Sequence, residues 1–144
     1  MNFAEILLNP IFFSCLVAVV IAQLIKIVID YLKDRKLNTS LFFSTGGMPS
    51  GHTAVVTALA TSVYIKQGVT ALFAVVLVIA IMTIYDSLTI RKAVGHHTSI
   101  LNAILKALKL HKKMAVKELA GHSLTQVIVG MLLGFIVAYL VSMI

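Results

Sequence analysis

A run of glycine, proline, serine and histidine is the part of the sequence best suited to chemistry. It reads Gly46-Gly47-Met48-Pro49-Ser50-Gly51-His52-Thr53. Glycines allow a turn in which backbone N–H groups converge, and a proline favours the start of the helix that follows. The N-terminus of a helix binds phosphate well, because its first N–H groups have no partner inside the helix. The residues that we expect to bind phosphate are Gly46, Gly47, Ser50 and Gly51, with His52 as a proton donor at the edge.

A second group of candidates lies inside an apolar segment, where ionisable residues are costly and therefore functional candidates. These polar residues, spaced so that they share one face of a helix, are Gln23, Lys26, Asp30 and Lys33. The alternative interpretation is that Lys26 and Asp30, four residues apart, only neutralise each other. Near the end of the chain, His122 and Gln126 share a helix face with Gly130 and Gly134. The glycines predict close helix packing, which does not explain His122 or Gln126.

Four apolar stretches must position these residues, and each is a candidate membrane span of about 20 residues. They are Ile11–Leu32, His52–Ile65, Val69–Tyr85 and Leu124–Ile144. The second is short enough to be re-entrant. We therefore predict an all-α integral membrane bundle with about four transmembrane helices, forming a single domain over residues 1–144.

The composition supports this class, because 60% of the 144 residues are apolar and only 12% are charged. Lys and Arg number 12 against 5 Asp and Glu, but they lie between apolar segments, so we expect no nucleic-acid partner. Cys15 is the only cysteine, and acidic residues are scattered, so neither a disulfide nor a metal site is expected. With four spans, the loops Lys33–Gly51 and Ser87–Gly121 carry 10 basic residues on one side, and Lys66 stands alone on the other. This asymmetry predicts a multi-pass protein of the cell membrane with both loops cytoplasmic.

Within the second loop, Ser99–Lys113 has the pattern of an amphipathic helix. Its apolar stripe comprises Ile100, Leu101, Ile104, Leu105 and Leu108. A basic amphipathic helix beside a membrane usually lies in the interface, where anionic lipids would be its partners; a simple cover for the bundle is the alternative. Because so few helices enclose a polar site poorly, we also expect a homodimer.

These motifs together resemble a known family. Pro49-Ser50-Gly51-His52 matches the central motif of the type-2 phosphatidic acid phosphatases, whose family also includes the vanadium haloperoxidases. The longer string from Gly46, the Asp86–Arg91 stretch followed by Gly95, and Gly121-His122 resemble its divergent bacterial and plant branch. The resemblance extends from about Gln23 to Gly134.

The resemblance implies a role for each matching residue. Lys26 would bind phosphate and His52 would be the general acid. His122 would be the nucleophile, because His122-x-x-x-Gln126-Val127-x-x-Gly130 follows the family's His-x-x-x-Asp-Val-x-x-Gly. Gln126 would then orient His122 by a hydrogen bond, although it lacks the charge of the family's Asp.

Other positions depart from the family pattern. Lys33-Asp34 stands where the family has Arg-Pro, and Val116 replaces an Arg. Arg91-x-x-x-Gly95-x-His97 copies the family's Arg-to-His spacing and makes His97 an alternative nucleophile. Arg91 would bind phosphate in either alignment. Asp86 could orient a histidine, pair with Arg91 or cap a helix end.

The implied activity is phosphoryl transfer to histidine followed by hydrolysis, with no metal and no cofactor. A site at the cytoplasmic surface favours a lipid phosphate substrate such as phosphatidylglycerophosphate or phosphatidic acid. Polyprenyl phosphates or diphosphates are an alternative substrate class. The departures from the pattern also support a non-catalytic protein that binds anionic lipid, and Lys26 and Asp30 within a span leave a small transporter open.

Overall fold

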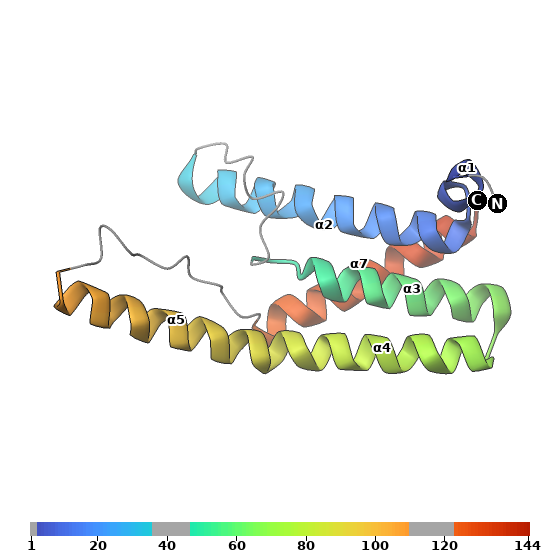
Figure 1. Ribbon diagram of the computed structural model, residues 1–144. Coiled ribbons are helices and arrows are strands. Elements are labelled where there is room, and N and C mark those ends of the chain that lie inside the picture. The colour runs from blue at the N-terminus through green and yellow to red at the C-terminus, as the bar shows by residue number, and fades with distance from the viewer. Residues whose placement is uncertain (1–2, 36–46, 110–122) are drawn as a thin grey trace.

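In the computed structural model, every regular element among the described residues is an α-helix (Figure 1). The structure describes residues 3–35, 47–109 and 123–144. The helices are α1 (Phe3–Leu7), α2 (Pro10–Asp34), α3 (Gly51–Gln67), α4 (Ala71–Leu88), α5 (Ile90–Ala107) and α7 (Leu124–Ser142). The predicted all-α class is confirmed.

Helix α3 is central to the bundle, because it contacts α2, α4 and α7. Helix α7 also contacts α2 and α4. Figure 1 shows both chain ends and the turn between α3 and α4 at one end of the bundle. The end of α2, the start of α3 and the start of α7 lie at the other end. The polar motifs of the sequence are therefore carried to a single end of the bundle.

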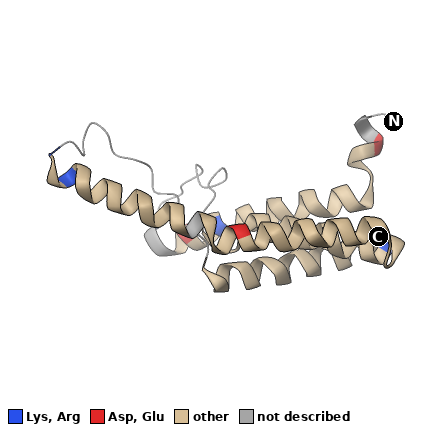
Figure 2. Ribbon diagram, turned by 60° about the horizontal axis from the view of Figure 1, so that its bottom comes forward, with Lys and Arg blue, Asp and Glu red and all other residues tan. Residues whose placement is uncertain are grey.

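Within the described residues, three stretches are long and apolar enough to cross a membrane: Pro10–Leu32, Ala71–Ala107 and Leu124–Ser142. The second combines α4 with α5. Helix α3 has 17 residues, the lower limit for a spanning helix. In Figure 2 the ribbons of the bundle are almost entirely free of charged residues. The bundle thus has the length and the composition of a membrane domain, with three to four spanning helices.

Small residues form the core, which lets the helix backbones approach closely, as is usual between membrane helices. The core comprises Ala18 and Ala22 of α2, Ala54 and Ala58 of α3, and Val137 and Ala138 of α7. A side chain on Gly130 would place its Cβ 2.6 Å from the carbonyl oxygen of Ser50. One on Gly134 would overlap the backbone of Ala54. The predicted glycine packing face is confirmed, and its partner is α3.

Helix α5 corrects the predicted boundaries of the amphipathic segment. The sequence pattern predicts Ser99–Lys113, but the helix begins at Ile90, separated from the end of α4 by Thr89 alone, and continues to Ala107. The apolar stripe extends backwards through Val94 and Ile90, so the helical period starts earlier than the stretch first selected. Residues 110–113 lie outside the described residues. Among the described helices, α5 contacts α4 alone, and Figure 1 shows it leading away from the bundle.

Candidate active site

The first turn of α3 is organised by Ser50, which is fully buried. Its hydroxyl oxygen caps the helix by accepting hydrogen bonds from the backbone N–H of Thr53 (3.4 Å) and from the Thr53 hydroxyl (2.9 Å). Pro49 precedes this cap, so it lies just before the helix rather than in its first turn. Ser50 thus lies at the start of α3, and its observed contacts are those of a helix cap.

A backbone hydrogen bond joins this turn to the start of α7. The N–H of Ser50 donates to the carbonyl oxygen of Gln126 at 3.0 Å. Gly130, one turn further along α7, faces Ser50 and leaves room for this approach. Because the N–H groups of Ser50 and Thr53 have partners inside the protein, they are not open to a ligand. Gly51 is a buried residue whose N–H has no partner among the described residues, so this N–H is a backbone donor left for a ligand.

The side chain of Lys26 crosses from α2 to this same turn. It is only 5% exposed. A Cβ on Gly47 would lie 3.5 Å from Lys26 Cδ, and a Cβ on Gly51 would lie 3.8 Å from Lys26 Nζ. The stem of the lysine therefore passes Gly47 and its ammonium group ends beside the first residue of α3. Gly47 has φ of +95°, which favours glycine whatever the space available.

No partner for the Lys26 ammonium group is found within residues 3–35, 47–109 and 123–144. In particular, no ion pair joins it to Asp30, although the two share a helix face. The interpretation of Lys26 and Asp30 as a self-neutralising pair is therefore not what the structure contains. A lysine with so little exposed surface and no counter-charge is costly. Its position beside the N-terminus of α3 makes a bound anion the natural source of that charge.

Gln23 joins this group, one turn before Lys26 on α2. A Cβ on Gly51 would lie 3.8 Å from Gln23 Nε2, the same distance as from Lys26 Nζ. The Oε1 atom of Gln23 is buried and accepts no hydrogen bond. The spacing in the sequence predicts that Gln23 shares the Lys26 face, but it assigns Gln23 no function. Its polar character inside an apolar helix was the available signal.

His52 is the second residue of α3 and is exposed, unlike its neighbours Gly51 and Thr53. Its side chain therefore lies at the surface, next in sequence to Gly51, and its predicted role as a proton donor stays a prediction. Gly46 and His122 lie outside the described residues, so their predicted roles stay predictions.

The Gln126 side chain has a structural function that the sequence analysis missed. Its Oε1 accepts a hydrogen bond from the Ser123 N–H at 3.0 Å, while the Ser123 hydroxyl accepts one from the Gln126 N–H at 3.3 Å. This reciprocal pair is a capping box, and the spacing Ser-x-x-Gln was its signal. The amide thus stabilises the first turn of α7. Its predicted role in orienting His122 stays a prediction.

The structure does not bring His97 to the Lys26 group. His97 is exposed on α5, and among the described helices α5 contacts α4 alone. Asp86 is partly buried in the last turn of α4, and Arg91 lies in the first turn of α5, where its side chain is outside the described part. These two positions flank the α4–α5 junction, at the same end of the bundle as the start of α7 (Figure 1).

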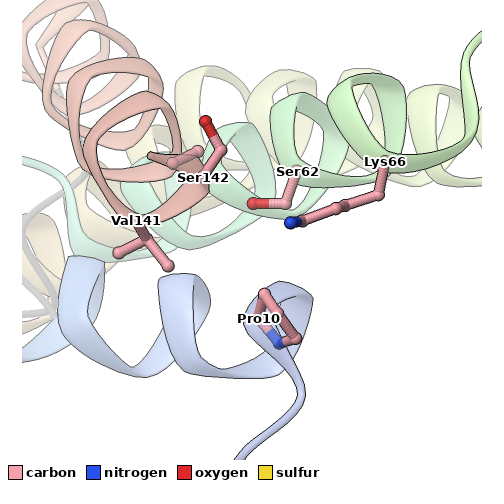
Figure 3. A pocket seen from close by; sticks show the side chains of 6 residues that line it. Pro10, Ser62, Lys66, Val141 and Ser142 are labelled. Atoms are coloured by element: carbon pink, nitrogen blue, oxygen red, sulfur yellow. The ribbon is translucent and has the colours of Figure 1, made fainter. Parts of the chain in front are cut away.

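A shallow hollow lies at the opposite end of the bundle (Figure 3). Its lining consists of Pro10, Ser62, Lys66, Ala138, Val141 and Ser142. Nearby, the hydroxyl groups of Ser14 and Ser62 share a buried hydrogen bond of 2.6 Å that joins α2 to α3. This end contains one cation and no histidine among its lining residues. Elsewhere in the described ranges, no cluster of three His, Cys, Asp or Glu side chains could hold a metal ion.

Comparison with known proteins agrees with the membrane helices. Residues 7–137 match the model of the "Divergent PAP2 family". The chain belongs to this family, and it is thus a phosphatase-related, multi-pass membrane protein. It is 35% identical over 153 aligned positions to the uncharacterized membrane protein YuiD of Bacillus subtilis strain 168, covering 96% of this chain and 97% of that protein. No solved structure matches the chain at a significant level.

Proposed function

We propose that this protein is a membrane lipid phosphate phosphatase that hydrolyses a phosphomonoester through a phosphohistidine intermediate. The substrate would be of the phosphatidylglycerophosphate or phosphatidic acid type, with polyprenyl phosphates and diphosphates as the alternative. The observation that carries this proposal is the position of Lys26. The Lys26 side chain is only 5% exposed, and its ammonium group has no partner among the described residues and lies beside Gly51, whose N–H also has none among them.

These two donors suit a phosphoryl group better than a neutral ligand. The ammonium group would neutralise one phosphate oxygen, and the first turn of α3 would bind another through its N–H and its dipole. Arg91 would supply a further positive charge. Such groups stabilise the charge that spreads over the phosphoryl oxygens in the transition state. They would therefore accelerate phosphoryl transfer as well as bind the substrate.

The reaction proceeds in two steps. A nitrogen of His122 attacks phosphorus, a nitrogen–phosphorus bond forms, and the bond from phosphorus to the alcohol oxygen breaks. His52 gives that oxygen its proton. In the second step water attacks phosphorus, His52 takes a proton from the water, and inorganic phosphate leaves His122. Gln126 would hold the imidazole of His122 in position. Asp86, which lies at the α4–α5 junction, is the alternative for this role.

We place this reaction at the cytoplasmic membrane surface. The basic loops favour that side, and they would also attract anionic lipid around the site. A homodimer would help to close the site from the bilayer. Light scattering in detergent, corrected for bound detergent, tests this point: a monomeric mass would contradict the dimer.

The proposal is tested with purified protein in EDTA and with three substrates: phosphatidylglycerophosphate, phosphatidic acid and undecaprenyl diphosphate. We expect phosphate release from a phosphomonoester lipid, and acid-labile phosphate on His122 when the reaction is quenched with base. A folded protein that binds these lipids and releases no phosphate from any of them would contradict it.

One observation favours a second function, a non-catalytic protein that binds anionic lipid. The side-chain oxygen of Gln126 is used in the α7 cap, whereas the phosphatases that the sequence resembles have an Asp at this position. A neutral capping amide stabilises a charged imidazole less than a carboxylate does. Binding of lipid phosphates without turnover would establish this second function.

A further inference from the structure

Gln23 places an unsatisfied hydrogen-bond acceptor beside the proposed phosphate site. Its Oε1 is buried and accepts no hydrogen bond, although Gln23 Nε2 and Lys26 Nζ lie equally near the Cβ position of Gly51. A buried acceptor of this kind costs free energy unless a donor reaches it. Each remaining oxygen of a fully ionised phosphate group is an acceptor, so the phosphate itself cannot satisfy Oε1. With the Lys26 ammonium group bound to the phosphate, the missing donor would come from another part of the ligand or from water.

The position of Gln23 along α2 indicates which part of a lipid it would contact. Helix α2 ends at Asp34, at the same end of the bundle as the start of α3 (Figure 1). Gln23 precedes Lys26 by one turn, which places it about 4.5 Å further towards the middle of the bundle, at 1.5 Å per residue. In a membrane lipid the acyl chains lie on this inner side of the phosphate. The alcohol to which the phosphate is joined therefore lies level with Gln23 when the phosphate lies at Lys26.

We propose that Gln23 is a specificity residue for the lipid substrate. Its Oε1 accepts a hydrogen bond from a hydroxyl group on the carbon adjacent to the one that carries the phosphate. The preferred substrates would then be lipid phosphomonoesters with a free neighbouring hydroxyl, as in a glycerol phosphate headgroup. This inference rests on the proposed function. A site built to bind a hydroxyl discriminates strongly against the analogue that lacks it, because the buried acceptor is then left unpaired.

Two lipids that differ in this hydroxyl alone test the inference. The first is 1-oleoyl-glycerol 3-phosphate, and the second is the 3-phosphate of 1-oleoyl-propane-1,3-diol. Phosphate release by the purified protein gives kcat/KM for each. Gln23→Met removes both polar atoms and keeps the length of the side chain. Leu24→Met is the matched control, because Leu24 is the next residue and is 51% exposed. Thermal unfolding checks that each variant is folded.

We expect wild type and Leu24→Met to prefer the hydroxyl-bearing lipid by about tenfold in kcat/KM. Gln23→Met should retain activity on the deoxy lipid and lose the preference. A structural role for Gln23 would lower both rates together and leave the ratio unchanged, and that result would overturn the inference. So would a wild-type protein that treats the two lipids alike.

Failure of the proposed function is recognised separately, as the absence of phosphate release from both lipids by folded wild type. In that case we would measure the dissociation constants of the two lipids for the same three proteins in nanodiscs. The ratio of the two constants then tests the hydroxyl contact. A wild-type ratio of about ten that falls to one in Gln23→Met would still support the hydroxyl contact. Equal dissociation constants in wild type would overturn it.

Discussion

The backbone N–H of Ser50 donates a 3.0 Å hydrogen bond to the backbone carbonyl oxygen of Gln126. This bond links two motifs that are far apart in the sequence, the glycine-rich turn before α3 and the start of α7. Both partners are main-chain atoms, so the link fixes the two helix ends regardless of side-chain chemistry. Gly130 permits it, because a Cβ there would lie 2.6 Å from the Ser50 carbonyl oxygen. The N-terminus of α3 is thereby held beside the helix that His122 precedes.

Replacing Lys26 with methionine should separate activity from stability. Met keeps much of the apolar stem that passes Gly47 and removes the charge of a side chain that is only 5% exposed and has no partner among the described residues. We expect phosphate release to fall by about 100-fold or more, because the charge acts on the transition state. Thermal stability in detergent should stay the same or rise, because an uncompensated buried charge is removed.

The control for that experiment is Lys66→Met at the other end of the bundle, which should change neither quantity substantially. A large fall in the unfolding temperature of Lys26→Met would show that Lys26 supports the fold, and would count against its role at a phosphate site.

Two glycine substitutions should affect different quantities: Gly51→Ala should lower activity, and Gly134→Ala should lower stability. A methyl group on Gly51 would lie 3.8 Å from its nearest neighbours, which is ordinary contact, so Gly51→Ala should fold. It would nevertheless occupy the space between Lys26 Nζ and the α3 N-terminus, and we expect activity to fall more than tenfold. Gly134→Ala would overlap the Ala54 backbone and should destabilise the bundle by about 1–3 kcal/mol.

Thermal unfolding and phosphate release on both alanine variants check this pair. If Gly51→Ala retained full activity, a phosphate could not lie between Lys26 and Gly51.

The dual role proposed for Gln126 can be separated with its capping partner. Ser123→Ala and Gln126→Ala each break the capping box and should each cost about 1 kcal/mol of stability. If Gln126 also orients His122, Gln126→Ala should lose activity beyond the loss seen in Ser123→Ala. Equal activity of the two variants, measured below their unfolding temperatures, would restrict Gln126 to the helix cap.

Substitution of His97 distinguishes the two candidate nucleophiles. Because α5 contacts only α4 among the described helices, we expect His97→Ala to retain most of the wild-type rate. His122→Ala should reduce phosphate release to background. The reverse outcome, an inactive His97→Ala beside an active His122→Ala, would move the reaction to α5.

Much of the fold could be predicted from the sequence, because apolar length and glycine spacing act locally. The spans and the packing of Gly130 and Gly134 follow from such patterns. The predicted start of the amphipathic helix at Ser99 is wrong, because Ile90 and Val94 continue the apolar stripe of Ile100 towards the N-terminus. The predicted helix boundary therefore depends on which residues are counted as the end of the apolar stripe.

The site was predictable only in part. Lys26 and the turn around Gly51 were both candidates. In the structure, the Nζ atom of Lys26 lies 3.8 Å from the position that a Cβ on Gly51 would take. The sequence could not show that Lys26 avoids Asp30, because both interpretations fit the same helix face. It also could not show that the Ser50 N–H is taken by Gln126, since that bond depends on how α3 and α7 pack. Tertiary contacts, rather than local pattern, decide which polar groups remain open.

The most direct test of the central claim is phosphate release from phosphatidylglycerophosphate in EDTA by wild type, His52→Ala and His122→Ala. His96→Ala is the matched control, because His96 is exposed on α5 and has no proposed role. We predict that wild type and His96→Ala release phosphate at similar rates, and that the other two variants lose at least about 100-fold. Full activity in both His52→Ala and His122→Ala would contradict the account.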